Sequence, residues 1–147
     1  MGAVGQIIQT LIEPLIGRPT ELSDAVVTRY PELARAKWRR GGLPVRVGGW
    51  CLGQRTVAAI TLWNTVWLAF DLEPSVELLL HELRHVHQFE ASRAFPILYL
   101  WESIRHGYVS NRFEKDARLY AAERSALNGE VRPEARSAEG RTDSKRV

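Results

Sequence analysis

The segment from Ser75 to Ala91 limits what this chain can fold into more than any other part of the sequence. It is predicted to be a helix, because Ser75 can cap the free amides at its start and Glu77 lies in the first turn, beside the positive end of the helix dipole. Apolar residues occupy nearly every side of it, at Leu78, Leu79, Leu80, Leu83, Val86 and Phe89. A helix that is apolar all round is buried, so the rest of the fold must be built around this one.

The same helix carries polar groups that need partners, in the run His81-Glu82-Leu83-Arg84-His85. Residues four apart share a helix face, so His81 and His85 can bind one Zn²⁺ ion together. Glu82 points about 100° away around the helix, where it can act as a base on a zinc-bound water. Two imidazoles and a carboxylate inside a core must be satisfied, and a metal ion does so. His87 lies off this face, and we expect it to have an ordinary structural role.

Turn residues and apolar spacing predict the other elements. We expect a helix over residues 19–38 that Pro31 bends or splits, and a short strand over residues 43–47, where apolar residues alternate with Pro44 and Arg46. A hairpin follows, with strands Ala58–Trp63 and Thr65–Phe70 and a positive φ at Asn64. Helices are predicted over residues 95–105, ended by Gly107, and from Asn111 onward.

Composition indicates a single globular domain. The chain has 147 residues, 45% of them hydrophobic and 25% charged, which is enough to bury a core. The net charge of +3 is spread among interspersed acidic residues, which argues against nucleic-acid binding. The single cysteine, Cys51, cannot form an internal disulfide; together with the lack of a signal peptide or an apolar run of membrane-spanning length, it favours a cytoplasmic protein.

Three regions follow from these patterns: N-terminal helices over residues 1–40 packed on the domain, a catalytic core over 41–128, and a disordered tail over 129–147. Within the first region, apolar residues between Val4 and Ile16 recur at helical spacing. We expect this amphipathic helix to pack on the body of the protein, with docking to a partner or a membrane surface as the alternative.

The order of hairpin, motif helix and later glutamate resembles the zincin metallopeptidases, in particular the gluzincin branch. The closer resemblance is to small bacterial metallopeptidase-like proteins with His-Glu-Leu-x-His-x-x-Gln, here His81 to Gln88, and Asn-x-Phe-Glu-x-x-Ala, here Asn111 to Ala117. It covers about residues 43–127. It implies an α+β fold with a small, mainly antiparallel sheet packed on an active-site helix, zinc bound by His81, His85 and Glu114, and Glu82 as general base.

The sequence differs from the motifs of two zincin branches, at one position in each. The metzincin branch would have a third histidine at position 91, where this chain has Ala91. Gluzincins carry an acidic residue four positions after the ligand glutamate, and this chain has Arg118 there, so a zinc histidine must be oriented by another group.

The third ligand has rivals in Glu102, Asp116 and Glu123, and Glu114 could instead complete a capping box with Asn111. We prefer Glu114 as a ligand because Ala117 and Ala121 follow it on the same helix face and would let that face approach the zinc helix closely. For the group that stabilises the transition state, His106, Tyr108 and Tyr120 are candidates, and we favour Tyr108.

These expectations combine into a zinc-dependent endopeptidase that holds an extended peptide or protein substrate along the edge strand Ala58–Trp63. Two alternatives remain open. One is a metal-binding scaffold without turnover, and the other is an interaction module that uses the N-terminal face of Ile7, Leu11 and Leu15.

Overall fold

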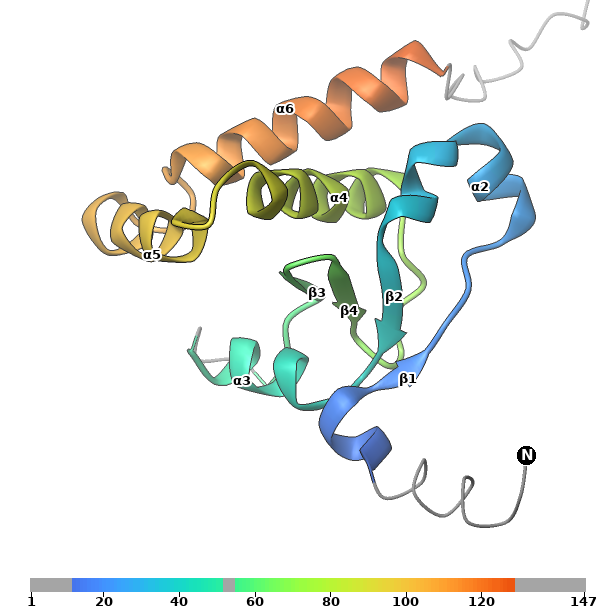
Figure 1. The fold of residues 1–147 in the computed structure, drawn as a ribbon, viewed down its shortest axis with the longest axis horizontal. Coiled ribbons are helices and arrows are strands. Elements are labelled where there is room, and N and C mark those ends of the chain that lie inside the picture. Colours follow the sequence, from blue (N-terminus) through green and yellow to red (C-terminus); the bar gives the residue numbers. More distant parts are fainter. Residues whose placement is uncertain (1–11, 52–54, 129–147) are drawn as a thin grey trace, which may run out of the picture.

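The computed structural model describes residues 12–51 and 55–128 of the chain. The predicted tail and residues 4–11 of the predicted N-terminal helix lie outside the described residues, whereas residues 12–16 are helical. The fold is α+β, as predicted, with a small sheet on one side of helix α4 (Val76–Ala91) and helix α6 (Arg112–Leu127) on the other, as Figure 1 shows.

The described strands form one mixed sheet in the order β1-β2-β4-β3. The outer pairings, of β1 (Arg18–Pro19) with β2 (Lys37–Arg40) and of β3 (Ala59–Leu62) with β4 (Thr65–Leu68), are antiparallel, and the central pairing of β2 with β4 is parallel. Strand β3 therefore lies at one edge of the sheet, within the segment predicted to be the edge strand.

Helix α4 is the buried centre of the molecule, as its sequence predicts. The hydroxyl of Ser75 caps it by accepting a hydrogen bond from the Leu78 amide at 3.2 Å. Four of its apolar side chains, at Leu79, Leu80, Leu83 and Val86, join the core formed by residues of the sheet and the N-terminal elements, namely Tyr30, Leu33, Trp38, Val66 and Leu68.

Helices α5 (Phe95–His106) and α6 follow the predicted boundaries closely. Gly107 ends α5 with a φ of 75°, a backbone conformation that residues with a Cβ rarely adopt. Helix α6 runs along α4 and buries Ala117 and Ala121 against it, so the small residues on this face do permit the close approach that their spacing predicts.

The N-terminal prediction was wrong in part. Residues 19–38 do not form one helix: helix α2 (Asp24–Arg29) is followed by the 3₁₀ helix η1 (Pro31–Arg35), and Trp38 lies in strand β2. The chain does divide at Pro31. Because β1 and β2 pair into the same sheet as β3 and β4, residues 18–40 contribute half of that sheet rather than helices alone.

Two further local predictions were wrong. The segment predicted as a strand at residues 43–47 is part of helix α3 (Leu43–Cys51). In the hairpin turn the positive φ, 54°, belongs to Trp63 rather than to Asn64. The strands of that hairpin are β3 and β4, somewhat shorter than expected.

Candidate metal centre

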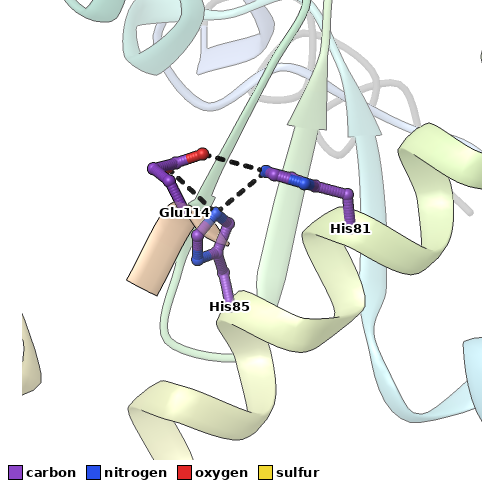
Figure 2. A group of neighbouring side chains, drawn as sticks. All are labelled: His81, His85 and Glu114. Atoms are coloured by element: carbon purple, nitrogen blue, oxygen red, sulfur yellow. Dashed lines mark hydrogen bonds and ion pairs between the residues drawn. The ribbon is translucent and has the colours of Figure 1, made fainter. Parts of the chain in front are cut away.

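Three side chains from two helices meet at one point beside the sheet, as Figure 2 shows. His81 and His85 come from adjacent turns of α4, and Glu114 comes from the first turn of α6. The Nε2 atoms of the two histidines are 3.2 Å apart. Glu114 Oε2 lies 3.2 Å from His81 Nε2, and Glu114 Oε1 lies 3.3 Å from His85 Nε2. This group could hold a metal ion.

The side chain of Glu114 is available to the histidines because it takes no part in capping its own helix. Asn111 caps α6 by accepting a hydrogen bond from the Phe113 amide at 2.8 Å. The capping-box alternative would require the Glu114 carboxylate to accept from the Asn111 amide, but that amide donates to the Tyr108 carbonyl. The carboxylate faces the histidines instead, and the residue is only 1% exposed.

The Glu114 carboxylate is held as an anion. Burial favours its neutral form, but the two imidazoles and the Tyr99 hydroxyl hold the pKa of Glu114 well below its ordinary value. Tyr99 donates to Oε1 at 2.6 Å. Oε2 is buried and accepts no hydrogen bond from any described residue. The side chains beside it are His81, with Nε2 at 3.2 Å, and Arg118, with Nη1 at 3.8 Å. A buried carboxylate oxygen without a hydrogen bond is costly, and a cation between it and the imidazoles would compensate it.

The orientation of His85 is fixed by Gln88, one turn further along α4. The Gln88 amide nitrogen donates to the Phe113 carbonyl at 3.1 Å and to Asp116 at 2.8 Å. Its oxygen is therefore the atom that lies 2.8 Å from His85 Nδ1, and the ring must donate through Nδ1. In the neutral imidazole this leaves the lone pair on Nε2, pointed at Glu114 and His81.

Asp116 completes this support from α6. Its carboxylate also accepts two hydrogen bonds from Arg84, at 2.7 and 3.1 Å, and these bonds are the main reason that the pKa of Asp116 is lowered. Asp116, a rival for the third ligand, is thus occupied with Arg84 and Gln88. Position 118, where the gluzincin pattern has an acidic residue, is an arginine here. Asp116, two positions earlier, instead supports His85 indirectly, through Gln88.

Glu82 lies beside the cluster without belonging to it. The residue is buried, and its Oε2 atom accepts a hydrogen bond of 2.6 Å from the hydroxyl of Thr61 on the edge strand β3. Its negative charge contributes, with Glu114, to a raised pKa of His85 that burial alone would lower. Glu82 thus faces the histidines while Thr61 fixes one of its oxygens.

The cluster opens into a cleft of about 1030 Å³ between β3, α4 and α5. Glu82, His81, His85 and Glu114 line it together with mainly apolar side chains, among them Ile60, Leu62, Leu78, Phe89, Leu100 and Ile104. Tyr108 and Arg118 also line it. A molecule in this cleft would therefore contact both the cluster and the edge strand.

The three candidates for the stabilising group have different positions. Tyr108 is half exposed in the cleft, where burial and the nearby Glu114 carboxylate raise its pKa. His106 is exposed and lies 3.9 Å from Glu102. Tyr120 packs instead against the ring of His87 and under the guanidinium of Arg84, outside the residues that line the cleft.

The remaining residues singled out from the sequence lie elsewhere. The carboxylate of Glu102 faces Arg112 at 3.4 Å, and Glu123 is exposed on α6, so neither joins the cluster. His87 has the structural environment expected for it, and burial lowers its pKa.

Tyr99 and Thr61 were not anticipated. Tyr99 shares a helix face with Phe95 and Ser103, and this face of α5 turns toward the cluster: the Tyr99 ring lies edge-on to His85, with centroids 5.9 Å apart. That spacing was available in the sequence. For Thr61 no local signal exists, because only the packing of β3 on α4 brings it to Glu82.

Comparison of the chain with protein-family models, with curated proteins and with solved structures gave no match. Among the described helices, none has the length and apolar character needed to cross a membrane.

Proposed function

We propose that this protein is a zinc-dependent peptidase whose metal ligands are His81, His85 and Glu114. The observation that carries the proposal is the set of contacts among the three side chains: the two histidine Nε2 atoms are 3.2 Å apart, Glu114 Oε2 lies 3.2 Å from His81 Nε2, and Glu114 Oε1 lies 3.3 Å from His85 Nε2. Zinc bonds of about 2.0–2.1 Å at tetrahedral angles hold neighbouring ligand atoms about 3.3 Å apart. The contacts between the imidazoles and the carboxylate are of this length, so one atom from each side chain could take three corners of a zinc tetrahedron and leave the fourth for water or substrate.

The donor set also favours zinc over harder cations. Imidazole nitrogens suit zinc and other late transition metals, whereas calcium and magnesium prefer oxygen ligands. Two histidines and one carboxylate are a ligand set that catalytic zinc sites use. Bound zinc would supply a water whose pKa is lowered to about 7.

Glu82 would remove the proton from that water and deliver it to the leaving amine. It is suited to this because it borders the same cleft as the histidines but is not one of the three proposed metal ligands. The hydrogen bond from Thr61 to Oε2 limits the rotation of the carboxylate. Tyr108 would donate its phenolic hydrogen to the developing oxyanion, since its raised pKa keeps it protonated.

The edge strand suggests how a peptide would be held. In the β3–β4 hairpin, Leu62 pairs with Thr65 across a two-residue turn, and the Ala69 amide donates to the Ala58 carbonyl at 2.8 Å. Main-chain groups alternate in direction along an antiparallel strand, so those of Ala59 and Thr61 point to the outer edge. An extended peptide could pair with them by strand addition and pass over the cluster.

Substitution of the base tests the proposal. Zinc-loaded parent protein is expected to cleave members of a generic peptide library, and Glu82→Gln should retain stoichiometric zinc while losing cleavage. Glu123→Gln is the matched control, because it removes an exposed carboxylate that is not part of the metal-ligand cluster. Zinc binding without cleavage by the parent would favour a metal-binding scaffold, and cleavage by zinc-loaded Glu82→Gln would refute the mechanism.

A further inference from the structure

The outer face of α5 is a continuous apolar surface. Ile97, Trp101 and Ile104 follow one another at helical spacing and are 74%, 58% and 73% exposed. Leu100, beside them, is also exposed. The opposite side of the helix is anchored, since the ring of Phe95 packs against Phe89 and Phe113. The exposed stripe is therefore a fixed feature of the fold, and its helix α5 lies at one end of the molecule in Figure 1.

Arginines flank this surface along the chain. Between Ala91 and Phe113 the chain has three arginines, Arg93, Arg105 and Arg112, against one acidic residue, Glu102. Glu102 is only partly exposed and faces Arg112 at 3.4 Å. Arg93 and Arg105 are exposed near the two ends of α5. An apolar stripe with a tryptophan and flanking arginines is the pattern of a helix that lies in a membrane interface.

We propose that the outer face of α5 binds the surface of a membrane that contains anionic lipids. The helix has 12 residues, too few to cross a bilayer, so it would lie along the interface with Ile97 and Trp101 among the acyl chains. Arg93 and Arg105 would then meet the negative headgroups.

A second copy of the chain fits this face less well. A two-fold contact through α5 would bring the like-charged arginines of both copies toward the same interface, which opposes association. An anionic lipid surface instead complements both the apolar stripe and its charges.

Membrane binding through α5 would affect the cleft, because residues of this helix form both the proposed membrane-binding surface and part of the cleft lining. Five residues of α5 line the cleft, while Ile97 and Trp101 are absent from its lining; the five are Pro96, Tyr99, Leu100, Ser103 and Ile104. Binding by the outer face would hold the cleft next to the membrane. The inference does not depend on the proposed peptidase activity, since it rests on residues outside the metal cluster.

The test is co-sedimentation of the full chain with vesicles of equal parts phosphatidylcholine and phosphatidylglycerol, and with vesicles of phosphatidylcholine alone. The parent should bind the mixed vesicles, and the paired substitution Ile97→Ser with Trp101→Ser should weaken binding by about tenfold or more. The paired control, Leu119→Ser with Leu127→Ser, removes two exposed leucines of α6 and should leave binding unchanged. Circular dichroism and zinc titration report whether each variant is folded.

A charge variant keeps the test independent of packing. Replacement of Arg93 and Arg105 by glutamine should weaken binding by about fivefold for each charge and reduce its sensitivity to salt. Four results would overturn the proposal: no binding by the parent, equal binding to phosphatidylcholine alone, binding unaffected by the α5 substitutions, or self-association of the parent in sedimentation velocity that those substitutions abolish.

Discussion

Gln88 offers the sharpest test of how the metal centre is supported. Its amide makes three hydrogen bonds: one within α4, to His85 Nδ1 at 2.8 Å, and two that join α4 to α6, to the Phe113 carbonyl at 3.1 Å and to Asp116 at 2.8 Å. Gln88→Leu keeps a side chain of similar size but removes all three. His85 then loses the acceptor that fixes its ring and directs the Nε2 lone pair to the metal.

The expected loss in zinc affinity is about 10- to 100-fold, the usual effect of removing such a partner. This corresponds to about 1.4–2.7 kcal/mol of binding free energy. The metal-free protein should also unfold more easily, by about 1–3 kcal/mol, because Asp116 and the Phe113 carbonyl each lose a hydrogen bond from the Gln88 amide. Zinc affinity is measured by titration against a competing chelator, and unfolding by urea denaturation.

The matched control is Glu90→Leu on the same turn of α4, where the side chain is half exposed and pairs with Arg35 at the surface. It should leave zinc affinity unchanged. Equal zinc affinities of the parent and Gln88→Leu would show that His85 does not depend on this support, and the reasoning would fail.

Three further predictions concern other parts of the structure. Thr61→Val removes the hydroxyl that holds Glu82, so steady-state kinetics should show a kcat about tenfold lower with zinc content unchanged; an unaltered kcat would contradict this role of Thr61. Ala121→Leu inserts a large side chain between α4 and α6 and should destabilise the protein by about 1–3 kcal/mol in urea denaturation, unlike the same substitution at the exposed Ala122. Burial is the largest single influence and would raise the pKa of Glu32, but the hydrogen bond and charge of Arg124 and a backbone hydrogen bond together outweigh it and lower the pKa below the ordinary value of 4.5. Its stabilising effect is therefore present above pH 4.5 and lost as the pH falls further, so Glu32→Gln should lower the melting temperature at neutral pH and the difference from the parent should vanish in acid. A difference that persists unchanged in acid would contradict this.

The sequence predicts those parts of the site that depend on the residue spacing within a single helix. The two histidines share a face because they are four residues apart, and the small residues Ala117 and Ala121 indicate the face of α6 that packs closely. The support of His85 by Gln88 and Asp116 depends on the register of α6 against α4, which the sequence of neither helix specifies.

The fold was predicted less well where distant contacts override local pattern. Residues 43–47 alternate as in a strand, yet they begin helix α3, which packs through a glycine: a Cβ at Gly49 would lie 2.4 Å from the Thr56 backbone. Trp38 continues a helical pattern, but it pairs with Val66 in the parallel centre of the sheet and donates its indole N–H to the Leu33 carbonyl at 2.9 Å. Both outcomes depend on contacts outside the segment itself, with Thr56 for α3 and with Val66 for Trp38, which a local pattern does not specify.

The central claim is that Glu114 joins His81 and His85 as a metal ligand. The most direct measurement is the zinc dissociation constant of the parent, of Glu114→Ala, and of Asp116→Ala and Glu102→Ala, each with its zinc stoichiometry. The account predicts one tight site in the parent, the greatest loss of affinity in Glu114→Ala, a smaller loss in Asp116→Ala through Gln88, and none in Glu102→Ala. Parent-like zinc binding by Glu114→Ala, with binding lost in either of the other variants, would contradict it.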